Sequence, residues 1–281
     1  SLATDGGGRG KTLGQIRTVT VNVPAARVDQ AIARLQRNPA VERVTRAVSV
    51  GVAGAPNDPS YSTQWALPKI AWDQANGVVA IPGSATIAVL DTGINASHPD
   101  LAGRVVSGVS FTGGDPNIDP HGHGTQMAGI AAANVNNGTG IAGVGYAGVS
   151  VASVQVLASD GTGEDADVVD GVLWAADHGA KVILMAFSSN DYSPALADAI
   201  DYAWSQGVTV VAATGNGGSS ASTYPSGMAH VLGVAATDQN DRVTSVSNTG
   251  SAAVAAPGVG IRTTSGTSGY TNVSGTSAAS A

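Results

Sequence analysis

Four positions in the chain carry side chains that could do chemistry together. Asp91 follows an apolar run, and His123 stands between two glycines. Asn216 follows a second apolar run, and Ser277 stands among small residues. A hydroxyl becomes a nucleophile when an imidazole takes its proton and a carboxylate orients that imidazole. An amide can donate a hydrogen bond to the oxyanion that forms.

Each position also has a structural interpretation. Asp91 could begin a turn, Asn216 with the glycine after it could be an ordinary Asn-Gly turn, and Ser277 could cap a helix. His121 and His123 do not match a zinc-binding His-Glu-x-x-His pair, because they are two residues apart with no Glu between them. The order Asp, His, Ser along the chain makes the catalytic interpretation the stronger one.

Apolar runs that alternate with helical patterns must position these side chains. The runs are typical of strands buried on both faces, and they cover residues 85–90, 151–157, 181–185 and 208–213. Amphipathic helices are predicted for residues 165–178 and 193–206. This rhythm predicts an α/β fold with a mostly parallel sheet flanked by helices. The carboxyl ends of such strands are where open sheets hold their sites, and Asp91 lies there.

The first fifty residues have a different pattern. Residues 1–13 are Gly-rich and predict a loose segment, and residues 15–23 and 41–50 alternate as strands do. A helix that opens at Pro24 lies between them, so a small α+β module is predicted. Residues 51–59 read as a linker. We therefore expect two domains, 1–52 and 53–281.

Composition excludes several function classes. The 281 residues carry a formal net charge of −7, which gives no electrostatic reason to bind nucleic acid or an anionic membrane. The absence of cysteine excludes thiol catalysis and disulfides. No apolar run reaches the ~18 residues that a membrane-spanning helix needs.

Four motifs resemble the signatures of the subtilisin-like (S8) serine peptidases. They are Val89-Leu-Asp-Thr-Gly-Ile94, Gly122-His-Gly-Thr125, Val210-Val-Ala-Ala-Thr-Gly-Asn216 and Ser274-Gly-Thr-Ser277. Three further segments resemble the thermitase-like branch, namely 56–61, 136–143 and 237–241. Residues 15–50 resemble an I9-type propeptide. The resemblance implies a subtilisin-like fold and a secreted serine endopeptidase in precursor form.

The resemblance assigns roles to these residues. It implies that Ser277 is the nucleophile, His123 the base, Asp91 its orienting carboxylate and Asn216 the oxyanion donor. The backbone of two segments would bracket a protein or peptide substrate as an added strand, namely Gly161, Thr162, Gly163 and Ala186, Phe187, Ser188. The propeptide would act as an intramolecular chaperone and inhibitor, and we expect a monomer.

The same resemblance implies a structural calcium ion. In this sequence the matching ligands are the side chains of Asp58, Asp100 and Asn137 and the backbone oxygens of Asn134, Thr139 and Ile141. Carboxylate, amide and carbonyl oxygens are the ligands that calcium prefers. The alternative interpretation is an Asn/Gly-rich surface loop with no ion.

The sequence also departs from the family pattern. Ser277 is followed by Ala278 where the family usually has Met, Gln126 replaces a second His, and Ser188 replaces a Gly beside the substrate. Truncation at both ends is expected, with low solubility and no measurable turnover of this chain as a consequence. The alternatives are a non-catalytic relative that serves as a binding module, and a different α/β hydrolase. The latter is disfavoured because Gly-x-Ser-x-Gly is absent and its chain order differs.

Overall fold

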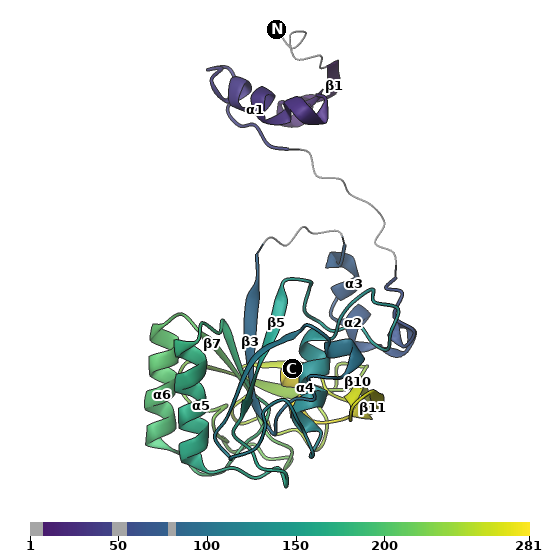
Figure 1. Ribbon diagram of the computed structural model, residues 1–281. Helices are drawn as coiled ribbons and strands as arrows, with labels where there is room; N and C mark the ends of the chain where they lie inside the picture. Colours follow the sequence, from purple (N-terminus) through teal and green to yellow (C-terminus); the bar gives the residue numbers. More distant parts are fainter. Residues whose placement is uncertain (1–7, 47–54, 78–82) are drawn as a thin grey trace. The chain divides into compact units, whose positions relative to one another are not determined.

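The computed structural model describes residues 8–46, 55–77 and 83–281. The chain divides into two compact units, residues 1–52 and residues 53–281, and each is described by itself (Figure 1). No helix in the described residues is long and apolar enough to cross a membrane.

The first unit is a hairpin followed by a helix. Strands β1 (Gly8–Leu13) and β2 (Thr18–Asn22) pair antiparallel around the 3-10 turn η2 (Gly14–Ile16). A second 3-10 turn, η3 (Ala25–Arg27), then leads into helix α1 (Val28–Gln36).

This unit corrects two expectations from the sequence. Residues 8–13 were expected to be loose, but they form β1, because the Gly-rich stretch pairs with the β-branched residues of β2. A strand was expected over 41–50, but residues 41–46 form none, since no described strand pairs with them. Residues 47–50, and residues 51–54 of the expected linker, lie outside the described part of the chain.

The second unit is built on a seven-stranded sheet in which every described pairing is parallel. Its strand order is β4-β5-β3-β6-β7-β8-β9. The strands are β3 (Ala85–Asp91), β4 (Val105–Ser110), β5 (Val149–Gln155), β6 (Val182–Met185), β7 (Thr209–Ala213), β8 (Val231–Thr237) and β9 (Val254–Pro257). The expected strands are therefore present, each within about two residues of the predicted bounds.

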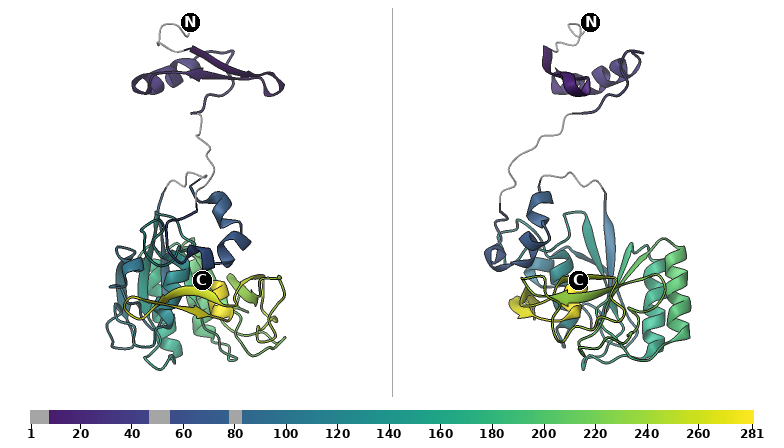
Figure 2. Two further views of the ribbon diagram at one scale, coloured as in Figure 1. Left: turned by 90° about the vertical axis from the view of Figure 1, so that its right-hand side faces the viewer. Right: turned by 180° about the vertical axis from the view of Figure 1, so that it is seen from behind.

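Helices cover both faces of this sheet. On one face lie α5 (Asp165–Asp177) and α6 (Pro194–Ser205), and on the other lie α4 (His123–Ala132) and α7 (Thr276–Ser280) (Figures 1 and 2). Short helical segments precede the sheet at η4 (Tyr61–Thr63), α2 (Ala66–Lys69) and α3 (Trp72–Ala75), and η5 (Pro99–Leu101) follows β3. The hairpin β10 (Ile261–Ser265) and β11 (Gly269–Val273) leads into α7.

Apolar side chains of the strands pack into a hydrophobic core on each face of the sheet. Leu90 of β3 packs with the α5 and α6 side chains, whereas its neighbour Val89 packs with those of α4. Successive side chains of a strand point to opposite faces of the sheet, so a continuous apolar run packs against the helices on both faces. This packing holds β3 in the interior of the sheet, and with it the position of Asp91.

Candidate active site

Strand order brings the predicted catalytic residues to one edge of the sheet. The chain leaves β3 for β4 and β5 on one side, and later returns to β6 on the other side. Such a switch in direction leaves a crevice at the carboxyl ends of the strands. Asp91 is the last residue of β3, and Ala186 comes directly after β6.

Asp91 and His123 form a close pair. The carboxylate of Asp91 is fully buried, and Nδ1 of His123 lies 2.8 Å from each of its two oxygens. The backbone N–H of Thr92 also donates to Asp91, at 2.8 Å. A carboxylate held in this way fixes the imidazole so that Nδ1 donates and Nε2 is left as the acceptor.

A glycine-rich turn brings His123 to this position. Gly122 has φ +92°, in the left-handed region that favours glycine, and it precedes the first residue of α4. A Cβ on Gly124 would lie 2.1 Å from the carbonyl oxygen of Gly93 and 3.0 Å from the Cβ of Asp91. Both glycines are needed for α4 to start against the end of β3.

The electrostatics around His123 favour the protonated imidazole. Burial lowers the pKa of His123, but the hydrogen bond to Asp91 and the charges of Asp91 and Asp119 outweigh it, so the pKa lies above its usual value. The raised pKa makes the imidazole a better acceptor for a proton from a neighbouring hydroxyl.

Ser277 is the second residue of α7, and α7 contacts α4. Its hydroxyl donates to the carbonyl of Ala186 at 2.6 Å. Among the described residues no hydrogen bond joins Ser277 to His123. The structure therefore brings the aspartate and the histidine together, and it shows the serine hydroxyl bonded to a neighbouring strand end.

The amide of Asn216 has a fixed orientation. Its oxygen accepts the backbone N–H of Thr276 at 2.9 Å and the Thr276 hydroxyl at 3.1 Å. The hydroxyl of Thr276 also accepts the N–H of Gly215 at 2.9 Å. With its oxygen held on the side of α7, the exposed side chain of Asn216 keeps its amide nitrogen as the donor end.

The two predicted substrate segments lie at neighbouring strand ends. Gly161 and Thr162 belong to a turn after β5, in which the N–H of Ala158 donates to the Thr162 carbonyl at 2.7 Å. A Cβ on Gly163 would lie 2.5 Å from the Val156 carbonyl. In the other segment, which follows β6, Ala186 is buried, Phe187 half-buried and Ser188 exposed.

The six predicted calcium ligands lie in one hydrogen-bonded cluster. Asp58 accepts the N–H groups of Asn136 and Asn137 at 2.9 and 3.2 Å. Asp100 accepts the Asn137 amide nitrogen at 2.8 Å and the Ile141 N–H at 2.9 Å. The remaining two members bond through their own backbone N–H groups, Asn134 to the Asp100 carbonyl and Thr139 to the Asn137 amide oxygen.

The charges of this cluster fit a cation. Both carboxylates are buried, and burial together with the charge of Asp100 raises the pKa of Asp58, against the effect of its backbone hydrogen bonds. Burial, then a hydrogen bond to Asp100 and the charges of Asp100 and Asp58, raise the pKa of the Tyr270 hydroxyl. No group of three or more His, Cys, Asp or Glu side chains in the described residues is arranged to hold a metal ion, so amide and carbonyl oxygens must supply the other ligands.

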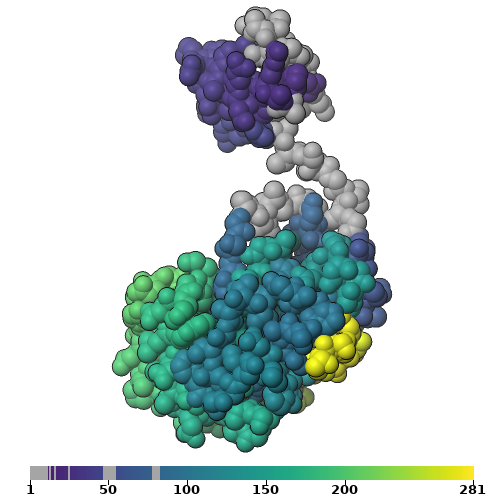
Figure 3. All heavy atoms as spheres, in the orientation of Figure 1, coloured from purple at the N-terminus to yellow at the C-terminus, as the bar shows by residue number. Residues whose placement is uncertain are grey.

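The β10–β11 hairpin packs on this cluster. A Cβ on Gly140 would lie 2.0 Å from the Tyr270 ring, and the ring of His98 meets that of Tyr270 edge-on at 5.3 Å. In Figure 3 the yellow segment that contains this hairpin lies at the surface, against earlier parts of the chain.

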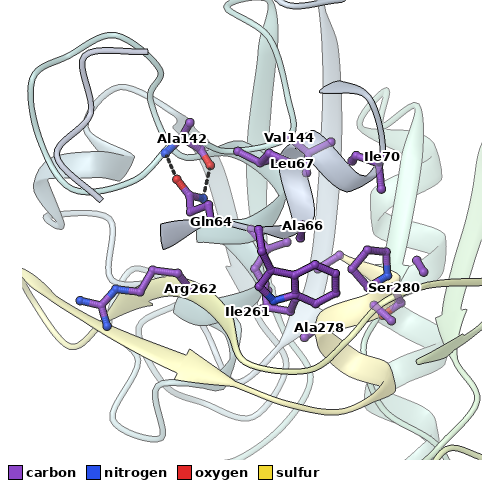
Figure 4. A pocket seen from close by; sticks show the side chains of 16 residues that line it. Gln64, Ala66, Leu67, Ile70, Ala142, Val144, Ile261, Arg262, Ala278 and Ser280 are labelled. Atoms are coloured by element: carbon purple, nitrogen blue, oxygen red, sulfur yellow. Dashed lines mark hydrogen bonds between the residues drawn. The ribbon is translucent and has the colours of Figure 1, made fainter. Parts of the chain in front are cut away.

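An apolar pocket lies beside α7. Its lining includes Trp65, Leu67, Ile261 and Ala278, and none of the predicted catalytic or substrate-binding residues (Figure 4). The side chain of Gln64 closes one end, where it bonds to both backbone groups of Ala142 (Figure 4). We therefore do not place the substrate in this pocket.

Two residues of the site were missed by the sequence interpretation. Thr276, which orients Asn216, stands directly before Ser277, so only its place in the motif could have indicated it. Asp119 accepts four hydrogen bonds around the start of α4. Its signal in the sequence was a carboxylate shortly before a helix, where such groups cap N–H donors.

Comparison with known proteins gives a consistent result. The family model described as "Subtilase family" matches residues 83–281. Thermitase of Thermoactinomyces vulgaris is 45% identical over 231 residues, which cover 80% of this chain and 81% of that protein. A thermophilic serine proteinase of Bacillus sp. (strain AK1) is 39% identical over 260 residues, covering 90% of this chain and 64% of that protein.

Solved structures agree with these relatives. A protease from Pseudoalteromonas arctica PAMC 21717 superimposes with a TM-score of 0.70 at 31% identity, over 81% of this chain and 84% of that one. A cold-adapted subtilisin-like serine proteinase gives a TM-score of 0.61, also at 31% identity, over 70% of this chain and 71% of that one. The predicted parallel α/β fold is confirmed.

Proposed function

Because the chain belongs to the subtilase family and is a serine-type endopeptidase, we propose that Asp91, His123 and Ser277 are its catalytic triad. The observation that carries this proposal is the contact of the His123 Nδ1 with both oxygens of the buried Asp91, at 2.8 Å. It leaves Nε2 free of the carboxylate and able to take a proton from Ser277. The alternative of a non-catalytic binding module is not favoured, since the relatives are named as proteinases.

The reaction begins with a rotation of Ser277. Its hydroxyl leaves the Ala186 carbonyl and turns to His123, which takes the proton as the oxygen attacks the scissile carbonyl. The imidazolium is stabilised by Asp91 and then returns the proton to the leaving amine. Water repeats these steps to release the acyl group.

We infer that Asn216 stabilises the oxyanion. Thr276 holds its amide oxygen, so the amide nitrogen is available to donate where negative charge develops. The backbone on either side, 161–163 and 186–188, would pair with an extended protein or peptide substrate. Because Ser188 stands where the family usually has a glycine, its side chain would restrict which substrate side chains fit next to the cleaved bond.

The test is replacement of the reacting groups. Ser277→Ala and His123→Ala should each lower kcat about 10⁶-fold, the loss known for subtilisin itself. Asn216→Ala should lower kcat about 10²–10³-fold, again the size known for subtilisin. Peptide hydrolysis by the purified variants measures this. Near-normal turnover by Ser277→Ala would remove the triad assignment.

We further propose that residues 1–52 are a propeptide and that the enzyme is secreted as a monomeric precursor. The support is the resemblance of residues 15–50 to such a segment and the separate compact unit that this part forms. Fractionation of a producing culture into cells and medium tests secretion, and gel filtration of the purified protein tests the monomer.

We also propose a structural calcium ion at Asp58, Asp100 and Asn137, with the backbone oxygens of Asn134, Thr139 and Ile141. Two buried carboxylates that repel each other support it. The ion would neutralise this charge and tie the segment at Asp58 to the loop after α4. It takes no part in the proposed proton transfers.

A further inference from the structure

The loop before α4 contains a buried carboxylate that the proposed mechanism does not use. Asp119 is only 5% exposed. One oxygen accepts the hydroxyl of Thr92 at 2.8 Å and the N–H of Gly122 at 2.7 Å, and the other accepts the N–H and the hydroxyl of Thr125 at 2.8 and 2.7 Å. Four donors point at its two oxygens, so each oxygen accepts two hydrogen bonds.

The partners of Asp119 lie directly beside the catalytic pair. Thr92 follows Asp91 at the end of β3, and Gly122 precedes His123 at the start of α4. One carboxylate therefore joins the two segments that hold the acid and the imidazole. Such an anchor defines their separation, because neither segment can shift without breaking a buried hydrogen bond to a charged group.

Thr92 connects the two carboxylates. Its hydroxyl oxygen lies 2.8 Å from Asp119 and 3.2 Å from Asp91, and it accepts the N–H of Gly124 at 3.1 Å. Because the Thr92 hydroxyl has one proton, it donates along the shorter contact, to Asp119. Asp91 is thus left to the Thr92 N–H and to His123, so both of its oxygens stay directed at the imidazole.

The charge of Asp119 acts on the same imidazole. Burial lowers the pKa of His123, and Asp91 and then Asp119 raise it. His121 also faces this side chain, and its exposed ring has its centroid 6.2 Å away. Asp160, whose pKa is lowered by hydrogen bonds from Thr162 and slightly by the charge of His121, is fully exposed, so solvent screens it.

We propose, on the basis of the proposed triad, that Asp119 is a positioning residue of the active site. Its buried carboxylate holds the end of β3 against the start of α4 and places a second fixed negative charge beside the Asp91–His123 pair. It touches neither substrate nor the reacting atoms, and it acts through the orientation and the protonation of His123.

The test compares three variants of the protein. Asp119→Asn removes the charge and leaves donors facing an amide, Asp119→Glu keeps the charge on a longer side chain, and Asp115→Asn removes an exposed charge from the same loop. The readouts are kcat, the acid limb of kcat/KM against pH, and the NMR titration of the His123 ring. His123→Ala identifies that ring signal.

Each variant has its own expected result. Asp119→Asn should lower kcat about 10–100-fold, the cost of a displacement approaching 1 Å, and should move the acid limb and the ring titration to lower pH. Asp119→Glu should lower kcat by a similar factor and leave both titrations near those of the parent protein. Asp115→Asn should match the parent protein in all three readouts.

Several outcomes would overturn the proposal. Parent-like kcat and titrations in Asp119→Asn would do so, and so would an equal titration shift in Asp115→Asn. If Asp119→Asn does not fold, Asp119→Glu decides, and parent-like kcat in that variant contradicts the positioning role. The ring titration does not depend on turnover, so a failure of the proposed triad would be seen separately, as activity in Ser277→Ala.

Discussion

At the residue scale, the chemistry depends on one imidazole that must be neutral before it can act. The pKa of His123 lies above its usual value of 6.5, because Asp91 and Asp119 outweigh the effect of burial. The folded protein therefore binds this proton more tightly than the unfolded chain does. The resulting stabilisation of the fold is complete below pH 6.5 and is lost as the pH rises through the pKa of the folded state.

The pH profile follows from the same shift. Only neutral His123 accepts the Ser277 proton, so kcat/KM should rise with pH and reach half its plateau above pH 6.5. Replacement of Asp91 by Asn should lower kcat about 10⁴-fold, as the same change does in a trypsin-like enzyme, and should move the acid limb to lower pH. The profile is measured with an uncharged peptide substrate. If the acid limb of kcat/KM in the parent protein has its midpoint below pH 6.5, then Asp91 and Asp119 do not raise the pKa of His123 as described.

At the element scale, the start of α4 is limited by backbone contact with the end of β3. The Cβ of an alanine at position 124 would lie 2.1 Å from the Gly93 carbonyl, which no side-chain movement can relieve. Gly124→Ala should therefore push α4 away and lower kcat about 100-fold or more, since 1 Å of displacement costs that much.

Gly129, on the same helix, gives a matched control for Gly124→Ala. A Cβ there would meet the hydroxyls of Thr263 and Thr264 instead of the catalytic strand. Gly129→Ala should lower the melting temperature with a smaller effect on kcat. If the two variants lose stability and kcat in the same proportion, then α4 has no special role in positioning His123.

The loop after α4 supplies four of the six proposed calcium ligands. A calcium ion that binds the folded state alone should stabilise it by about 2.7 kcal/mol at a hundredfold excess over its dissociation constant. The melting temperature should rise with calcium, fall with a chelator, and lose this dependence in Asp100→Asn. Asp198→Asn, an exposed change of the same charge, is the control. Equal melting temperatures in all conditions would favour an Asn/Gly-rich loop held by its N–H donors alone.

At the scale of the whole molecule, the chain consists of two compact units. The first unit has a single buried apolar side chain among its described helix residues, Ala31, so it has little core of its own. Small units of this kind are marginally stable alone. This supports the proposal that the first unit acts on the second and is then removed.

Self-processing is the matching prediction. An active enzyme should cleave between Val48 and Ala55, a stretch largely outside the described residues, and the Ser277→Ala protein should keep both units joined. N-terminal sequencing of the product, with Ser277→Ala as the control, measures this. Cleavage at the same place in Ser277→Ala would assign the processing to another protease.

The sequence by itself predicted four of the seven strands of the sheet and the candidate reacting groups. Apolar runs predicted β3, β5, β6 and β7 because a strand buried on both faces needs apolar side chains at every position. The order Asp, His, Ser and the resemblance of four motifs to the subtilisin-like peptidases predicted Asp91, His123, Asn216 and Ser277.

Only the tertiary structure decided how these groups meet. The contact between Asp91 and His123, the orientation of Asn216 by Thr276, and the anchoring by Asp119 all join residues from different elements. The expected strand is absent over the described residues 41–46 for the same reason, since a strand depends on a partner that the local pattern does not specify. Periodicity reports which face of an element is buried, and the packing of one element on another decides which polar atoms come within hydrogen-bond distance.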